Sequence, residues 1–392
     1  MDANLRVLSR VDLISLLDSA MREPALYWNR RGKAGVEHSD TSVIKTFMVE
    51  AALTESSSRQ PAKDLALNIF KDRGVLSSAT LRIYESDDPE LLTIEADTGR
   101  GDIVGYLDIS NPRFWLLHSM SSSHALSGFM GGTFARETEL DKAWMPSQLL
   151  DRLSGLGPLR GLGLAFDRRV LADVDFDSPD APVEVLKMQL WGGSARQVLR
   201  ALQEEETLPN ATTLSKIRIS VESDGSGTAN IEDIKFDGKI SARGSSFTTH
   251  LALVNHVVDL YSEKIGTIEA EYPLKSDLLN GTHFLRGEPI NFLFTRPIVN
   301  LLAFCKALFS AREPFRLWGV PQRRAEGYYT VQAIDLHVGS NLRFEITPDF
   351  MRVYLPAEAC GNTIIRLYTN LQHHYDAMVK AENGNGDNIF EF

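Results

Sequence analysis

Hydrophobic and polar residues change their spacing along the chain, and the first part of this pattern predicts a helical N-terminal region, residues 1–76. Leucine, isoleucine and methionine recur at helical spacing after Ser9, which is a suitable helix cap. Asp40 can cap a second helix over residues 42–53, and a third helix is expected to begin at Pro61. We therefore expect this region to be helical, with a basic loop at residues 28–35 between the first two helices.

Residues 77–172 carry a different pattern, in which short β-rich runs alternate with Asp, Gly, Asn and Pro. Four runs predict a small antiparallel meander, at residues 80–84, 91–95, 102–107 and 113–117. The uncharged stretch 114–135 has the length of a membrane span, but half of it is not hydrophobic. It predicts a buried strand followed by a Ser/Gly-rich loop or short helix. A helix near 146–153 and a strand at 161–166 complete this small β/α domain, and the acidic, Pro-containing run 172–182 marks its end.

The second half repeats one order of elements: a strand, a helix, several antiparallel strands and a closing helix. We expect the first copy within residues 183–272 and the second within residues 286–380. Residue identities barely repeat, so this internal duplication is inferred from element order alone. The expected fold class is α+β: N-terminal helices and a small antiparallel meander, then two related strand–helix–antiparallel strands–helix modules. A flexible tail, residues 381–392, follows.

Composition places the 392-residue chain among globular proteins, with 43% hydrophobic and 24% charged residues. The net charge of −11 argues against nucleic-acid binding over the whole surface, so any such contact needs a local basic patch. Cys305 and Cys360 are too few for a disulfide framework or a Cys-based zinc site, which favours a reducing, cytoplasmic location. The N-terminus lacks an apolar signal segment, and the chain carries no nucleotide-, zinc- or nucleophile-elbow motif. We expect a soluble protein with no cofactor and no membrane contact.

One basic segment differs from this acidic background. Between Arg286 and Glu326, seven cations face three acids, so the segment is +4 and the rest of the chain is −15. Arginine forks match phosphate groups, and aromatic rings offer stacking surfaces for unpaired bases. We expect contact with nucleic acid or another anionic ligand through Arg296, Arg312, Arg316, Trp318, Arg323 and Arg324. The same alternation also fits an ordinary half-buried strand whose arginines pair with acids elsewhere.

Acid-x-Lys pairs favour a competing, enzymatic interpretation. Asp233 and Lys235, with Asp224 upstream, could hold a divalent metal and activate water beside a phosphate. The local order of helix, three strands, helix and strand resembles the core of the restriction-endonuclease-like fold. That family places its acid-x-Lys on the third strand, where this chain has Lys239 and Ile240 instead. A salt-bridged hairpin explains the same residues.

Histidines and aspartates cluster near the C-terminus. Asp335 and His337 are alternate residues of one predicted strand and share a face, and the last predicted helix carries His373, His374 and Asp376. If that helix packs on the strand, one of its histidines joins them as a metal ligand or an acid–base group. The polar end of an amphipathic helix explains these residues equally well.

The C-terminal tail combines a Gly/Asn-rich spacer with Ile389, Phe390 and Phe392. In style it resembles the acidic-aromatic tails of single-strand-binding proteins, which insert aromatic residues into a pocket of a partner. We expect these three residues to dock on a protein partner. A frayed terminus, or a tail that folds onto its own domain, is the alternative.

The missing catalytic signatures, the paired modules, the charge asymmetry and the tail favour a non-enzymatic binding or assembly subunit of a multi-protein complex. Such a subunit has protein partners and contacts nucleic acid or an anionic ligand through the basic segment. The alternative is a metal-dependent hydrolase, of the nuclease type, that uses Asp224, Asp233 and Lys235.

Overall fold

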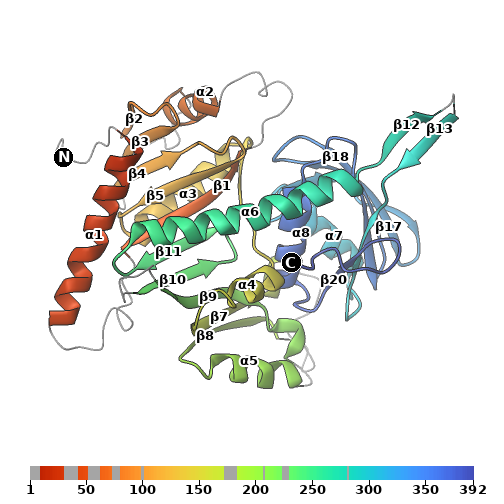
Figure 1. Ribbon diagram of the computed structural model, residues 1–392. Coiled ribbons are helices and arrows are strands. Elements are labelled where there is room, and N and C mark those ends of the chain that lie inside the picture. Colours follow the sequence, from red (N-terminus) through yellow and green to blue (C-terminus); the bar gives the residue numbers. More distant parts are fainter. Residues whose placement is uncertain are drawn as a thin grey trace. The chain divides into compact units, whose positions relative to one another are not determined.

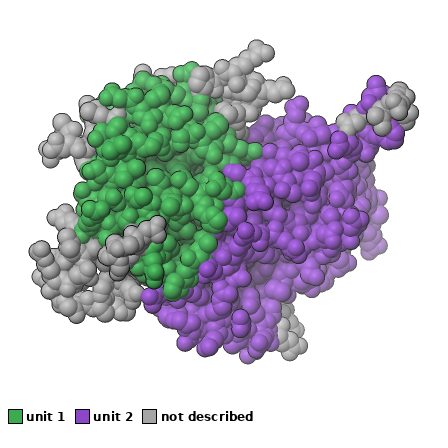
Figure 2. Space-filling model, viewed as in Figure 1, with its two compact units in different colours: residues 1–143, 156–158, 218–259 green, residues 144–155, 159–217, 260–392 purple. Residues whose placement is uncertain are grey.

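The chain forms two compact units in this computed structural model, and Figure 2 colours them separately. The structure describes residues 9–30, 43–51, 62–72, 80–98, 101–171, 183–205, 208–222, 229–279 and 282–392. Unit 1 consists of Met1–Ala143, Leu156–Pro158 and Arg218–Asp259, and unit 2 of Trp144–Gly155, Leu159–Ile217 and Leu260–Phe392. The division falls within strand β9 (Leu214–Glu222) and helix α6 (Phe247–Glu271), so each of these elements has residues in both units.

An antiparallel sheet forms the centre of unit 1 (Figure 1). Its strands are β1 (Ile44–Ala51), β2 (Thr80–Glu85), β3 (Leu91–Thr98), β4 (Gly101–Asp108), β5 (Phe114–Ser119), β6 (Leu140–Lys142), β10 (Ala229–Lys235) and β11 (Lys239–Arg243). They follow the order β2-β3-β4-β5-β1-β11-β10, and β6 also pairs with β1. The four predicted runs of the meander correspond to β2, β3, β4 and β5, so that part of the prediction is confirmed.

Strand β1 lies in the middle of this sheet, where the sequence predicted a helix over residues 42–53. That prediction is wrong, because all eight residues of β1 are buried and the strand pairs with β5 on one side and β11 on the other. A strand buried on both faces lacks the alternation by which a strand is usually identified from sequence. The N-terminal region therefore contains a central strand as well as helices.

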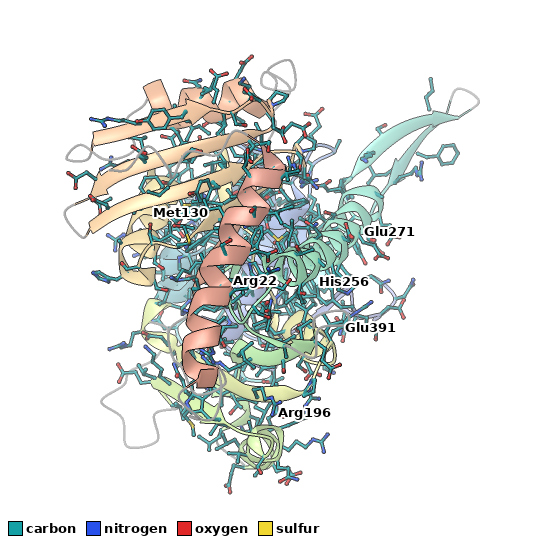
Figure 3. The ribbon with its side chains drawn as sticks, turned by 60° about the vertical axis from the view of Figure 1, so that its left-hand side comes forward. Arg22, Met130, Arg196, His256, Glu271 and Glu391 are labelled. Carbon is teal, nitrogen blue, oxygen red and sulfur yellow. The ribbon has the colours of Figure 1, made fainter. Side chains whose placement is uncertain are left out.

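Helices cover both faces of the unit 1 sheet. Besides α6, they are α1 (Arg10–Arg30), α2 (Ala62–Leu67), the π-helical turn η3 (Asn68–Asp72) and α3 (Ser123–Arg136). Leu17 of α1 and Phe247 of α6 share a core with Tyr106 on one face. Figure 3 shows these two helices with their side chains. The turn η3 and α3 pack around Trp115 on the other face. Helix α3 has 14 residues and begins after Ser122, whose hydroxyl caps it. The sequence predicted either a loop or a short helix in this segment.

Unit 2 contains a smaller antiparallel group of strands. Strand β7 (Leu159–Asp167) pairs with β8 (Val185–Trp191) over seven residues of each, and residues 214–217 of β9 lie beside β7. The helical segments of this part are α4 (Ser147–Leu153), η4 (Arg168–Val170), α5 (Ala195–Glu204) and η5 (Pro209–Ala211). Gly163 on β7 approaches β9 closely, since a Cβ there would lie 3.3 Å from Lys216 Cβ.

A second antiparallel sheet forms most of the rest of unit 2 (Figure 1). Its strands are β14 (Ile290–Leu293), β15 (Leu317–Gly319), β16 (Gln322–Ala325), β17 (Tyr328–Asp335), β18 (Asn341–Ile346), β19 (Phe350–Tyr354) and β20 (Lys380–Glu382). The order is β15-β17-β18-β19-β14-β20, and β16 also pairs with β17. Helices α7 (Leu301–Leu308) and α8 (Gly361–His374) cover one face. The ring of Tyr368 on α8 lies 6.2 Å from that of Phe292 on β14.

The hairpin of β12 (Lys275–Leu279) and β13 (Thr282–Arg286) is absent from the predicted elements. The Asn-Gly pair at 280–281 is the sequence signal for it, since this dipeptide favours two-residue hairpin turns. Leu278 and Leu285 on the hairpin are 65% and 74% exposed.

The mixed α+β class is confirmed, because helices pack on antiparallel sheets in both units. Within residues 286–380 the structure adds strand β16 between β15 and β17, which the sequence did not predict. Residues 218–259 belong to unit 1 and the rest of the first segment to unit 2, so the relationship between the two modules stays a prediction. Among the residues described, no helix is long and apolar enough to cross a membrane.

Candidate functional site

The second sheet of unit 2 is covered by helices on one face and exposed on the other. Along β17, β18 and β19, buried side chains alternate with half-buried or exposed ones. The buried set is apolar and includes Leu317, Val331, Leu342, Phe344, Met351 and Phe292. We call the outward set the open face, and it includes Trp318, Arg324, Thr330, Gln332, Ile334, Asn341, Arg343, Glu345, Phe350, Arg352, Tyr354, Asn291, Lys380 and Glu382.

Strand register places the open-face side chains in rows across the sheet, because directly opposite residues of antiparallel strands share a face. Three rows matter here: Trp318 with Ile334 and Asn341; Gln332 with Arg343 and Tyr354; and Thr330 with Glu345, Arg352 and Asn291. Aromatic and arginine side chains from four strands therefore lie on one surface of unit 2.

Glu345 is the acid at the centre of the open face. Arg343 donates to its Oε1 over 3.0 Å, and the Tyr354 hydroxyl donates to its Oε2 over 3.2 Å. Arg352 Nη1 lies 3.8 Å from the same Oε2. The Glu345 side chain is 15% exposed, whereas those of Arg343 and Arg352 are 53% and 38% exposed. The carboxylate is thus more buried than the two guanidinium groups that it attracts.

Further contacts orient the two arginines. The Arg343 guanidinium lies 5.5 Å from the ring centroid of Tyr354, and that of Arg352 lies 5.7 Å from the centroid of Phe350. Arg352 Nε also donates to Asn291 Oδ1 over 2.8 Å. Cation–π contacts and hydrogen bonds of this kind hold flexible guanidinium groups against the sheet.

Trp318 is the most exposed aromatic residue of the open face, and half of its surface is accessible. It lies on β15 between Leu317, which is buried, and Gly319. A Cβ on Gly319 would lie 2.6 Å from Val331 Cγ1 and 2.8 Å from the Gln332 carbonyl oxygen. Glycine at 319 therefore lets β15 approach β17, and strand alternation then turns the indole outward.

The structure separates the residues predicted to contact nucleic acid or an anion. Arg312, Trp318, Arg323 and Arg324 are exposed. Arg324 Nε donates to Thr330 Oγ1 over 2.9 Å, which places its guanidinium on the open face beside Thr330. Arg323 pairs with Tyr329 and so belongs to the opposite face of the strand pair, while Arg312 precedes β15.

The other two predicted arginines turn inward. Arg316 is buried, and its Nε lies 3.7 Å from Glu313 Oε1. Arg296 is half-buried, and its Nη2 donates to the Tyr375 carbonyl oxygen over 2.5 Å. Its guanidinium also lies 5.7 Å from the Tyr375 ring centroid. These two side chains are part of the interior of unit 2 rather than of the open face.

The acid-x-Lys residues lie in unit 1. Both oxygens of Asp233 on β10 accept from Arg218 on β9, over 2.5 and 2.7 Å. This bidentate pair occupies the oxygens that a divalent metal would need, and it is the salt-bridged hairpin that the sequence left as the alternative. Lys235 is half-buried at the end of the same strand. Asp224 lies outside the described residues.

The C-terminal tail packs on unit 2. Ile389 and Phe390 are buried, and the Phe390 ring stacks on Tyr368 of α8 with centroids 4.1 Å apart. Lys264 donates to the Ile389 carbonyl oxygen over 3.0 Å, and its ammonium lies 5.2 Å from the Phe392 ring centroid. The tail therefore folds onto its own unit, which was the alternative to docking, and its two buried residues are not exposed to a partner here.

Asp335 and His337 do meet the last helix, but through residues other than its histidines. The Thr363 hydroxyl of α8 donates to Asp335 Oδ2 over 2.5 Å, and Arg366 of α8 forms a buried ion pair with Asp335. The backbone N–H of His337 donates to Asp335 Oδ1 over 3.2 Å. Asp335 thus ties β17 to α8 as a buried ion pair with its hydrogen bonds satisfied.

The two adjacent histidines bind the backbone of unit 2. His373 Nδ1 lies 2.7 Å from the Ala165 carbonyl oxygen, and His374 Nδ1 lies 2.9 Å from that of Asp167. Burial lowers the pKa of His373 to about 3 and also lowers the pKa of His374. Asp376 accepts from the backbone N–H of Thr295 over 2.7 Å. These contacts give each residue a structural partner of its own.

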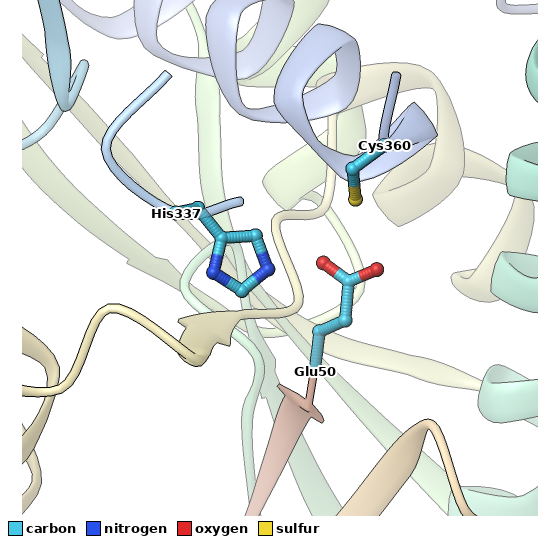
Figure 4. A group of neighbouring side chains, drawn as sticks. All are labelled: Glu50, His337 and Cys360. Atoms are coloured by element: carbon cyan, nitrogen blue, oxygen red, sulfur yellow. The ribbon is translucent and has the colours of Figure 1, made fainter. Parts of the chain in front are cut away.

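His337 and Cys360 offer metal-ligand atoms within 4.8 Å of each other in unit 2, and both are buried (Figure 4). Two protein ligands are fewer than the three or four that a zinc site uses. Glu50, also drawn in Figure 4, belongs to β1 of unit 1, where it accepts from Arg113 Nη2 over 2.7 Å.

A second arrangement of polar side chains lies in unit 1, and we call Thr46, His118, Glu232 and His250 the polar chain. Thr46 Oγ1 lies 2.9 Å from His118 Nδ1 and 2.7 Å from His250 Nε2. His250 Nδ1 lies 2.8 Å from Glu232 Oε2. The four residues are at most 1% exposed. They connect β1, β5, β10 and α6 by consecutive hydrogen bonds.

The polar chain has the order of a nucleophile, a base and an acid, as in hydroxyl-activating sites. If Glu232 is ionised and His250 carries a single proton on Nδ1, His250 Nε2 accepts the proton of the Thr46 hydroxyl. His118 then donates Nδ1–H to Thr46 Oγ1. Burial, together with nearby His250, lowers the pKa of His118 to about 3, so this ring is neutral at ordinary pH. The complete burial of all four residues keeps a substrate away from them.

Comparison with known proteins places the whole chain in one family. The family described as MJECL33-like protein matches residues 1–390. The chain belongs to this family. A relative from Methanocaldococcus jannaschii, described as uncharacterized protein MJECL33, is 29% identical over 309 residues, which cover 69% of this chain and 74% of the relative. Neither description states an activity, so the chemistry of this MJECL33-like chain has to be argued from its geometry.

Sequence reasoning on this family member missed Arg343, Glu345, Arg352 and Tyr354. The signal was present, because the two arginines, the glutamate and the tyrosine occupy alternate positions of two correctly predicted strands. The order of strands in the sheet was the missing information, since it brings β18 and β19 onto the same face as Trp318.

Proposed function

We propose that this protein is a non-enzymatic binding subunit that holds single-stranded nucleic acid on the open face of unit 2. The observation that carries the proposal is the half-exposed indole of Trp318 on one sheet face with Arg343, Arg352 and Tyr354. The broader expectation, that the protein works with protein partners in a complex, remains part of this proposal.

The aromatic residues support a ligand with unpaired bases. Sheets that bind single strands present aromatic rings on which successive bases stack. Trp318 and Tyr354 lie three strands apart and in neighbouring rows. With spacings of about 4.8 Å between strands and about 6.8 Å between rows, their Cα atoms are about 16 Å apart. One base cannot contact both rings, so the geometry suits an extended strand rather than a single nucleotide.

The charge of the open face supports an anionic ligand. Its cations are Arg324, Arg343, Arg352 and Lys380, and its acids are Glu345 and Glu382. This excess of positive charge is opposite in sign to the net charge of −11 of the whole chain. Guanidinium groups bind phosphate oxygens in pairs and also stack on bases, which favours a nucleic acid over an acidic protein surface.

Fluorescence anisotropy with a labelled oligonucleotide tests the proposal. We expect the full chain to bind single-stranded DNA or RNA of about 16 nucleotides, and Trp318→Ala to weaken this binding about 5- to 150-fold, since stacking contributes about 1–3 kcal/mol per base. Trp191→Ala is the matched control, because Trp191 is 48% exposed but lies on β8, away from the open face.

Two results would contradict the proposal. One is the absence of binding by the wild-type chain at low salt, where phosphate contacts are strongest. The other is an equal loss of affinity in Trp318→Ala and Trp191→Ala, which would show that the site lies elsewhere. Capture of an acidic protein in place of the oligonucleotide would favour a protein interface on the same face.

A further inference from the structure

We infer that Glu345 acts as a built-in competitor for phosphate, so that charge alone does not give tight binding on the open face and stacked bases have to add to it. This inference rests on the proposed function and names the residue that sets the affinity of that site for phosphate. Glu345 does not contact the ligand in this scheme. Its carboxylate forms the ion pairs with Arg343 and Arg352 in the free protein, and a phosphate group of the ligand replaces it.

The contacts of Glu345 are those that a phosphate group would make. Its two oxygens receive Arg343 at 3.0 Å and the Tyr354 hydroxyl at 3.2 Å, with Arg352 at 3.8 Å. Carboxylate and phosphate oxygens are the two common acceptors for arginine, so they compete for the same donors. Because both guanidinium groups are more exposed than the carboxylate, a ligand can reach them from solvent.

The ion pairs of Glu345 are easy to exchange. Partly exposed pairs contribute only about 0–1 kcal/mol, so separating them costs little. A phosphate that replaces the carboxylate gains stronger, charge-assisted hydrogen bonds, but it also meets repulsion from Glu345 at close range. The net gain from charge alone is therefore small. A ligand binds well only if it adds contacts of another kind, which here are bases stacked on Trp318 and Tyr354.

This arrangement predicts which polyanions the open face rejects. Inorganic polyphosphate supplies charge without bases, and it has to overcome the same competition from Glu345. A thymidine oligonucleotide of equal charge adds stacking to its phosphate contacts. We expect the wild-type chain to bind the oligonucleotide more tightly than polyphosphate because of stacking, and Glu345 to lower the affinity for both ligands by a similar factor.

Glu345→Gln tests the inference, with Glu382→Gln as the matched control. Both acids lie on the open face, and Glu382 is on β20, beyond Asn291 and away from Arg343. Glu345→Gln is expected to bind the thymidine oligonucleotide about fivefold more tightly, the upper limit for an exposed ion pair. Its salt dependence is expected to steepen by about one phosphate contact. Affinity for polyphosphate is expected to rise by a similar factor, because the same competitor is removed.

The binding data distinguish failure of the competitor role of Glu345 from failure of the proposed function. If the wild type binds the oligonucleotide and Glu345→Gln behaves like Glu382→Gln, the competitor role is refuted while the proposed function stands. If Glu345→Gln binds more weakly with unchanged circular dichroism and thermal midpoint, Glu345 positions the arginines and the inference is wrong. If neither the wild type nor the variant binds, the proposed function fails, and the inference fails with it.

Discussion

The polar chain of unit 1 and the open face of unit 2 both contain a glutamate with hydrogen-bonded polar neighbours. They differ in how far those neighbours are buried. In unit 1, Glu232 and His250 are completely buried, and both carboxylate oxygens of Glu232 and both ring nitrogens of His250 have a hydrogen-bond partner. In unit 2, Arg343 and Arg352 remain exposed around a partly buried carboxylate. Buried polar groups are costly to leave unpaired, so they stabilise one arrangement of strands and helices. Exposed ones contribute little to stability and stay available for a ligand.

Removal of a residue of the polar chain is expected to have the largest effect on stability. His250→Ala is expected to reduce the free energy of unfolding by about 3–5 kcal/mol, because it leaves the Glu232 carboxylate buried without its main partner. Urea unfolding followed by circular dichroism measures this loss. His256 is on the same helix but exposed, and it is labelled in Figure 3.

His256→Ala is therefore the control, with an expected change within about 0.5 kcal/mol. Equal destabilisation by the two variants would mean that the helix, rather than the polar chain, determines stability at this place. Oligonucleotide affinity of the folded fraction is expected to be unchanged in both variants, because neither residue belongs to the open face.

Lowering the pH is expected to decrease stability because His118 is buried, by less than the His250→Ala substitution does. Its pKa is about 3 in the folded protein and about 6.5 in an unfolded chain, so the unfolded state binds more protons between these values. Stability is complete above pH 6.5 and decreases as the pH falls towards 3, by about 2 kcal/mol at pH 5. Burial of His373 adds a similar dependence in unit 2.

Urea midpoints between pH 7 and pH 5 test this expectation. His118→Asn is expected to show a flatter dependence than the wild type, since the asparagine does not titrate, while the dependence that arises from His373 remains. Identical slopes in the two proteins would show that His118 is not held neutral by the fold. None of the open-face residues is a histidine, so affinity at pH 5 is expected to follow the folded fraction alone.

Most strands of the fold were predictable, and the exceptions have a common physical cause. The meander has alternating residues and clear turn signals, so β2 to β5 follow from the sequence. Strand β1 is buried on both faces, and its apolar residues at positions 44, 47, 48 and 51 fall at helical spacing. Helix α3 hides its buried residues among serines and glycines. The alternation of hydrophobic and polar residues identifies a strand that is buried on one face. It does not identify a strand that is buried on both faces.

The candidate site was predictable only in part, for a related reason. Trp318 followed from its place among arginines, and alternation in β18 and β19 could have indicated Arg343 and Arg352. Arg316 belongs to the same sequence cluster, yet its backbone has a φ of 52° and its side chain is buried. Residues close in sequence, such as Arg316 and Trp318, thus lie in different environments. Residues of β15 and β19 share one face because of the strand order, which cannot be deduced from the sequence.

Substitution of an open-face arginine is expected to change stability least. Comparing it with an arginine of the basic segment 286–326 that lies off this face tests which surface binds the ligand. Arg343→Ala is expected to weaken oligonucleotide binding about five- to tenfold and to lower the salt dependence by about one contact, with stability unchanged within about 0.5 kcal/mol. Arg323→Ala removes an exposed arginine from the opposite face of a nearby strand pair, so little loss is expected. Anisotropy titrations at two salt concentrations compare the variants. If Arg323→Ala loses as much affinity as Arg343→Ala, the ligand follows the β16 edge instead of the open face.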